Sequence, residues 1–313
     1  MMIIISKLGT AVLVSLILVL VYVDTPAQRY SAWSAPVNVG AMVNTPGFDG
    51  CPSLTRDGLN LLYMSNVGSG VFDLYVSHRA STDADSAWST PTSLGPNVNT
   101  ALFGEICPAL SISGRYLYFA SDRPGGSGNF DIYVSRRLNK SSWTEWSEPV
   151  NLGQGVNSTG PEFSPSLFED EDGSVYLYFS SGNRPGGLGL GDVWFSEMQM
   201  DGSFGPAQPV IELNSTMNDL RPKIRSRDGL EIFFDSNRPG TLGAQDLYTS
   251  TRACTGTSPE CAWTAPVNLG PIVNSSLIDG GASLSFDGTE LYFMSNRTGG
   301  FGDQDLYVTR RVK

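Results

Sequence analysis

Residues 116–136 read YLYFASDRPGGSGNFDIYVSR, and this stretch decides the class of fold. Its first six residues alternate as a β-strand does. The run that starts at Asp122 is a loop, because Pro and clustered Gly end strands and supply positive φ. Asp131 to Arg136 then forms another strand. With a short strand before it (108–112) and a Trp-containing strand after it, the unit has four antiparallel strands.

The unit recurs five times, with repeats that start near residues 33, 88, 146, 204 and 263. A fixed period of this size marks a solenoid or a propeller. Four antiparallel strands per repeat, arranged radially, predict an all-β five-bladed β-propeller over residues 28–313. We expect one domain, because a single repeat cannot bury its faces without its neighbours.

The two ends of this region complement each other. The chain begins with a Trp-type outer strand, Trp33 to Gly40, and ends with three strands of the last repeat, the last of them near 304–311. We expect the first segment to pair with the last strand, which removes an exposed edge and closes the ring.

The first 27 residues predict a targeting segment. Residues 8–23 form an apolar run, followed by Asp24-Thr-Pro-Ala27, which suits cleavage after Ala27. The alternative is an uncleaved membrane anchor, in which only residues 8–23 touch the membrane. Both readings place the folded part in the periplasm or outside the cell.

Charge and cysteines limit the partners. The formal net charge of −11 argues against nucleic acid and against an anionic membrane surface. Cys254 and Cys261 flank a short insertion and predict a disulfide-closed loop in an oxidising compartment. Cys51 and Cys107 occupy one position in successive repeats, and the sequence leaves open whether they pair or stay free.

The loop motif Ser-Asp-Arg-Pro-Gly-Gly (121–126) has counterparts at 182–187, 236–240 and 295–300. With the Asp-Ile-Tyr-Val-Ser that follows, it resembles the PD40 or WD40-like propeller repeats, related to the TolB propeller. The resemblance covers nearly all of residues 33–313 and implies a fold. It implies no activity, because propellers host many chemistries.

One acidic residue occupies the same register in every repeat, just before the innermost strand: Asp49, Glu105, Glu162, Asp219 and Asp279. In a propeller these positions surround the mouth of the central channel, where five carboxylates can hold a cation, a basic peptide or a sugar. The other reading is that each carboxylate accepts backbone N–H bonds in its own turn. Arg221 lies beside this ring and can either clamp an anion or pair with Asp219 or a neighbouring blade's acid.

A second acidic ladder follows the Gly-rich loops. It comprises Asp73, Asp131, Asp192, Asp246 and Asp305. The spacing lacks the acidic density of a calcium loop, so a calcium ion is possible but unsupported, and no cofactor or metal site is expected. Loop capping is the expected role of these residues, with Arg123, Arg184, Arg238 and Arg297 as candidate partners.

Enzyme signatures are sparse. His78 is the only histidine, which excludes Ser-His-Asp and multi-histidine metal sites. We therefore expect no catalytic residue, and we interpret the chain as a non-catalytic module that binds a protein or a carbohydrate at the channel face. The alternative is a carboxylate-based glycoside hydrolase that uses acids such as Asp49, Glu105 and Glu162.

Overall fold

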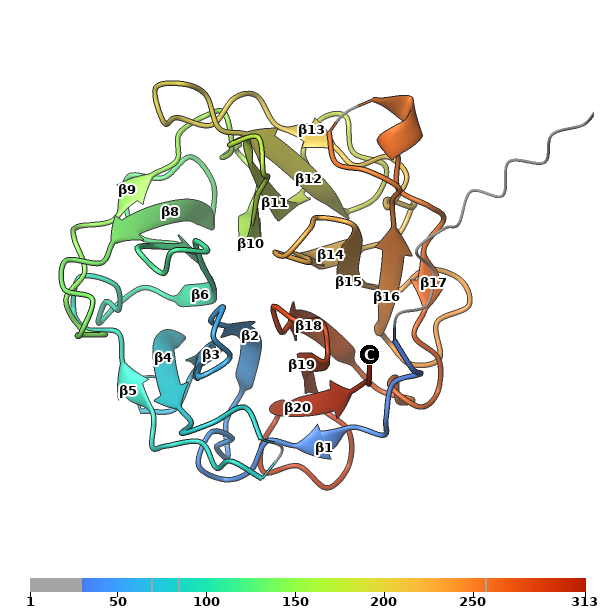
Figure 1. Cartoon of the computed structure of the whole chain (residues 1–313). Helices are drawn as coiled ribbons and strands as arrows, with labels where there is room; N and C mark the ends of the chain where they lie inside the picture. Colours follow the sequence, from blue (N-terminus) through green and yellow to red (C-terminus); the bar gives the residue numbers. More distant parts are fainter. Residues whose placement is uncertain (1–29, 69, 84, 257) are drawn as a thin grey trace, which may run out of the picture.

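The computed structural model describes residues 30–313 except 69, 84 and 257, and this part forms five four-stranded antiparallel sheets around a central axis (Figure 1). The predicted five-bladed β-propeller is confirmed. The expected targeting segment, residues 1–27, lies outside the described residues. In the described part, no helix is long and apolar enough to cross a membrane.

Each blade consists of four strands, which we call the innermost, second, third and outer strand in order of distance from the central channel. The innermost strands are β2 (Asp49–Leu54), β6 (Glu105–Leu110), β10 (Glu162–Glu169), β14 (Asp219–Ile224) and β18 (Asp279–Leu284). The second strands are β3 (Asn60–Ser65), β7 (Tyr116–Ser121), β11 (Val175–Gly182), β15 (Glu231–Ser236) and β19 (Glu290–Ser295). The third strands are β4 (Asp73–His78), β8 (Asp131–Arg136), β12 (Gly191–Glu197), β16 (Asp246–Thr251) and β20 (Asp305–Arg310). The outer strands are β5 (Thr92–Ser93), β9 (Val150–Asn151), β13 (Gln208–Pro209), β17 (Val267–Asn268) and β1 (Val37–Asn38). Blades 1 to 5 are named from the order of β2, β6, β10, β14 and β18.

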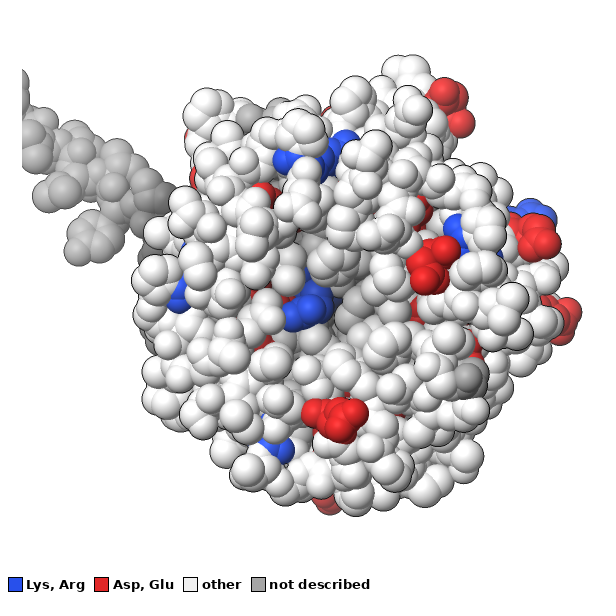
Figure 2. Space-filling model, turned by 180° about the vertical axis from the view of Figure 1, so that it is seen from behind, with Lys and Arg blue, Asp and Glu red and all other residues white. Residues whose placement is uncertain are grey.

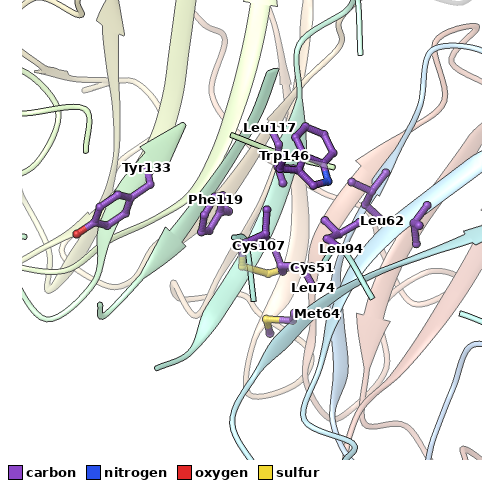
Figure 3. Packing of buried hydrophobic residues seen from close by; sticks show 12 residues of the cluster. Cys51, Leu62, Met64, Leu74, Leu94, Cys107, Leu117, Phe119, Tyr133 and Trp146 are labelled. Carbon is purple, nitrogen blue, oxygen red and sulfur yellow. A yellow bond between two sulfur atoms is a disulfide. The ribbon is translucent and has the colours of Figure 1, made fainter. Parts of the chain in front are cut away.

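The alternation of the second strands builds the core between blades. In β7, Leu117 and Phe119 are fully buried in the cluster shared by blades 1 and 2, which Figure 3 shows. Tyr118, between them in sequence, packs into the cluster shared by blades 2 and 3. Because successive side chains of a strand point to opposite faces, each blade contributes to two cores and depends on both neighbours.

The ring closes between the two ends of the described chain. β1 pairs with β20, with Val37 opposite Val308 and Asn38 opposite Tyr307. The predicted closure of the last blade by the Trp33 segment is therefore confirmed. The outer strands are only two residues long, and Pro36 immediately precedes β1. Proline has no N–H to extend the ladder, which accounts for the short pairing.

Every innermost strand carries a β-bulge at the same place. The register shifts two residues after the acidic position, and the bulge residue has a positive φ, between 47° and 57°. The five bulge residues are Cys51, Cys107, Ser164, Arg221 and Gly281. They line the narrow part of the central channel. The bulge therefore explains why a position with unlike residues is structurally equivalent in all blades.

Two of these bulge residues are covalently joined. Cys51 and Cys107 form a disulfide between β2 and β6, with their Cα atoms 4.7 Å apart (Figure 3). Cys254 and Cys261 also form a disulfide, as expected from the sequence. It closes the insertion between β16 and β17 of blade 4. The first disulfide ties neighbouring blades together at the channel wall.

Candidate functional site

The five acidic residues of the first ladder begin the innermost strands, and all five are fully buried. In blade 1, Oδ2 of Asp49 accepts bonds from the backbone N–H of Thr45 at 2.6 Å and from its hydroxyl at 2.8 Å. Backbone N–H groups of Thr100, Ser158, Ser215 and Ser275 serve the other four acids in the same way. Each carboxyl group thus holds the turn that leads into its own strand, and ligand contact by these residues stays a prediction.

Four of the five acids also bind an arginine from the loop between the second and third strands. The pairs are Arg123–Glu105 at 3.1 Å, Arg184–Glu162 at 3.7 Å, Arg238–Asp219 and Arg297–Asp279 at 2.6 Å. The expectation that these arginines serve the second ladder is wrong. The Arg-Pro-Gly loop folds back towards the innermost strand, so the acid that is distant in sequence is the nearer one in space.

The second ladder caps the Gly-rich loops, as the sequence indicates. Asp131 accepts the backbone N–H groups of Ser127 at 2.6 Å and Gly128 at 2.9 Å. Its Oδ2 also accepts a bond from Asn151 of the outer strand. Among the residues that the structure describes, no cluster of three His, Cys, Asp or Glu side chains has the arrangement to hold a metal ion.

Blade 1 departs from this pattern at Asp49. Its loop reads Ser65-Asn-Val67, so no arginine reaches the carboxyl group, and Oδ1 is buried without a hydrogen-bond partner. Burial raises the pKa of Asp49, and the neighbouring Ser65 and Thr45 offset only part of that rise. Asp49 is therefore the one acid of the ring that lacks a cation in the described structure.

Burial also raises the pKa of two further acids on the adjacent blades. For Glu105, burial outweighs the bonds from Thr100 and the charge of Arg123, and its pKa lies above the ordinary value. Burial likewise raises the pKa of Glu162, against bonds from Ser158 and Ser181. Blades 1 to 3 thus present three consecutive carboxyl groups whose environment disfavours the ionised form.

Arg221 pairs with an acid that the sequence analysis missed. Its Nε and Nη2 donate to the two oxygens of Asp235 in β15, at 2.8 and 2.6 Å, and not to Asp219 or to an acid of another blade. Asp235 is fully buried and also accepts the N–H of Gly281 in the neighbouring blade at 3.0 Å. Burial raises the pKa of Asp235 against the opposing charge of Arg221. The sequence could have revealed Asp235 as an exception, because the other four blades have Met, Ala or Ser at its position in the second strand.

The channel is narrow at the bulges and opens at one end. The narrow part, lined by the bulge residues, has a free volume of about 20 Å³, enough for about one water molecule. A cavity of about 510 Å³ lies at the end where the innermost strands finish and turn into the second strands. On one face of the ring, Figure 2 shows a central hollow with basic atoms on its wall. The large cavity and the acidic ring therefore lie at opposite ends of the innermost strands.

Comparison with known proteins defines the class of this fold. The sequence matches no protein-family model and no curated protein. The similar solved structures include glycoside hydrolases of families 43 and 62. A GH43_1 enzyme from Xanthomonas citri, complexed with xylotriose, has a TM-score of 0.59 at 15% identity, over 88% of this chain and 89% of that one.

Two arabinofuranosidase structures are similar to this chain to a comparable degree. An α-L-arabinofuranosidase from Lactobacillus brevis has a TM-score of 0.57 at 14% identity, over 88% of this chain and 92% of that one. The α-L-arabinofuranosidase PaAbf62A from Podospora anserina, in complex with cellotriose, has a TM-score of 0.54 at 12% identity, over 90% and 98%. At such identities the likeness shows the fold alone.

These findings correct two expectations. The resemblance to PD40 or TolB-type repeats is wrong, because the similar structures are glycoside hydrolases of families 43 and 62. Its Arg-Pro-Gly motif is explained by a local task, the pairing of a loop arginine with the acid of its own blade. The expectation of a non-catalytic binding module is also wrong, since the same structures favour the alternative of a glycoside hydrolase.

Proposed function

We propose that this chain is a glycoside hydrolase that cleaves a neutral oligosaccharide by means of carboxyl groups. The observation that carries the proposal is the position of three buried carboxyl groups, Asp49, Glu105 and Glu162, at the start of the innermost strands of adjacent blades. Burial raises the pKa of each of them. Glycoside hydrolysis needs one carboxylic acid that stays protonated and one carboxylate that acts as base or nucleophile. The similar structures, two of them with xylotriose or cellotriose bound, support this class of substrate.

The environments of these acids support different roles. Asp49 has no arginine and carries an unpartnered oxygen, so its protonated form is favoured and it is the proposed proton donor. Glu105 lies in the next blade, and burial raises its pKa too, but Arg123 at 3.1 Å lowers it in part. Because Asp49 has no such cation, Glu105 is the proposed base or nucleophile of the two. Because both groups are fully buried, the reaction requires the turns that precede β2 and β6 to open for substrate.

Hydrolysis by the full chain tests this function. The substrates are aryl α-L-arabinofuranoside, aryl β-D-xyloside, xylotriose and cellotriose, with release of phenol or reducing sugar as the readout. We expect hydrolysis of at least one of them, and a loss of about 100-fold or more in Asp49→Asn and Glu105→Gln, the usual size of a general acid or base contribution. Asp303→Asn, an exposed change near the same turn, is the control. No hydrolysis of any substrate, or full activity in both variants, contradicts the proposal.

We further propose that the enzyme works outside the cytoplasm. Two disulfides, Cys51–Cys107 and Cys254–Cys261, support this location, since structural disulfides persist in oxidising compartments. Thiol labelling of the protein isolated from its native compartment tests the point. We expect no free thiol before reduction, and labelling of all four cysteines would contradict it.

A further inference from the structure

The cavity of about 510 Å³ lies away from the proposed catalytic acids, at the far end of the innermost strands. Its wall is formed by the ends of β2, β6, β14 and β18 and by the turns that follow them. This volume is in the range of sites for small organic ligands. The cavity is therefore large enough for a small ligand that does not contact the proposed catalytic acids, and the charges on its wall indicate the kind of ligand.

Lys223 is the most unusual residue on this wall. It lies in β14 at a register where the other blades have Ser53, Ala109, Ser166 and Ser283. It borders both the cavity and the narrow channel. Among the described residues, no hydrogen bond or ion pair to its ammonium group is found, and burial lowers the pKa of Lys223 to about 8. Lys223 thus places a positive charge where the other blades have a small side chain, and among the described residues no carboxylate pairs with it.

Arg137 is a second cation on this wall, and it lacks the carboxylate partner that two of its three counterparts have. For the third counterpart, Arg252, no ion pair is found among the described residues either. Its counterparts Arg79 and Arg311 each bind a glutamate that begins the second strand of the preceding blade. The distances are 2.6 Å from Arg79 to Glu290 and 2.7 Å from Arg311 to Glu231. In blade 1 the matching residue is Asn60, which is neutral.

The neutral residue leaves the charge of Arg137 uncompensated at the cavity. Arg137 and Asn60 both line it. The guanidinium of Arg137 lies 3.7 Å from the ring centre of Trp143, and its Nε donates to the carbonyl of Ser142. Neither contact neutralises the charge, so among the described residues Arg137 has no carboxylate partner.

Arg56 adds a third positive charge. It stacks over the ring of Phe286 at 4.6 Å, and both residues border the cavity. The one acid among the lining residues is Asp57, which accepts bonds from the hydroxyl of Thr55 and the N–H of Leu59. Three cations against one acid make this cavity basic, although the chain as a whole has a net charge of −11.

We propose that this cavity binds a sugar that carries a carboxylate, a hexuronic acid or its disaccharide, with the carboxylate held by Lys223 and Arg137. Arginine and lysine bind carboxylates through charge-assisted hydrogen bonds. The hydroxyl groups of the lining serines and the amide of Asn60 suit a polyol, and Trp143 offers apolar contact. The site is separate from Asp49 and Glu105, so it stands whether or not the chain hydrolyses glycosides.

The repeats supply variants that keep the fold. Lys223→Ser installs the residue that three other blades have at this position. Asn60→Glu supplies Arg137 with the carboxylate that Glu290 and Glu231 give to its counterparts. Lys140→Ser removes an exposed lysine outside the cavity and is the matched control for the loss of charge.

Calorimetric titration of the full chain with galacturonate, digalacturonate, xylose and inorganic phosphate tests the proposal. We expect the uronates to bind and xylose and phosphate to bind at least 10-fold more weakly. Lys223→Ser and Asn60→Glu should each weaken uronate binding at least 10-fold, and Lys140→Ser less than twofold, with unchanged circular dichroism. Absence of uronate binding, equal or tighter binding of xylose or phosphate, or full binding by both cavity variants would overturn it.

Discussion

Asp49 and Asp279 occupy the same register, but loss of the charge should destabilise the protein much more at Asp279 than at Asp49. In both, one carboxyl oxygen accepts the N–H and hydroxyl of the residue four positions earlier, Thr45 or Ser275. An asparagine can keep both of these bonds through its oxygen. The difference is Arg297, which binds Asp279 at 2.6 Å and has no counterpart at Asp49.

The expected magnitudes follow from these contacts. Asp279→Asn leaves Arg297 without its anion, and removal of one partner of a buried ion pair costs about 3 kcal/mol. Asp49→Asn breaks no ion pair and should change the free energy of unfolding by no more than about 1 kcal/mol. Because burial raises the pKa of Asp49 above 3.8, the wild type loses stability as pH rises through that pKa. Asp49→Asn avoids this loss, so its stability relative to wild type should improve from pH 4 to pH 7.

Urea unfolding at pH 4 and pH 7, with disulfides intact, measures both effects. With an m value of about 3 kcal/mol per M, the Asp279→Asn midpoint at pH 7 should fall by about 1 M. The Asp49→Asn midpoint should move by less than about 0.3 M. Equal losses in the two variants, or a relative decline of Asp49→Asn as pH rises, would refute the argument from the missing arginine.

Three further changes probe other parts of the ring. Replacement of both Cys51 and Cys107 by serine should cost about 4 kcal/mol, from the loop entropy of a 56-residue separation, measured as the unfolding midpoint against wild type with its disulfides intact. Arg221→Gly should destabilise the protein by about 3 kcal/mol because Asp235 stays buried without a cation, and the double change with Asp235→Asn should recover most of the loss in a mutant cycle. A chain of residues 41–313 lacks β1, so size-exclusion chromatography should show a larger share of oligomers or aggregate than the full chain gives, and identical elution of the two chains would contradict the closure.

The repeat made the architecture predictable, but not the partners inside it. The period and the alternation in residues such as Tyr116 to Ser121 specify blades and their order, and the spare Trp33 segment specifies closure. The arginine pairing was missed because Arg123 is eight positions from Asp131 and 18 from Glu105 in sequence, and only the folded loop reverses that preference. Where a loop folds back, a short separation in sequence therefore does not identify the partner of an ion pair.

The surroundings of the candidate site residues could not be predicted from the sequence either. The acidic register was visible in the sequence, yet its burial depends on the turns that each carboxyl group closes, and no periodicity reports that. The cavity depends on how the ends of four innermost strands leave free volume. Lys223 and Asp235 were nevertheless readable as charges at positions that other repeats fill with small or apolar residues.

The pairing of β1 with β20 also sets the order of events during synthesis. Val37 and its partner Val308 are 271 positions apart, so the first strand of the ring is made long before the last one. At about 5–20 residues per second, the ribosome takes about 15–55 s to cover that distance. Throughout that interval the chain has four blades at most and an unpaired edge at each end. Synthesis of β20 is therefore the step before which the ring cannot close.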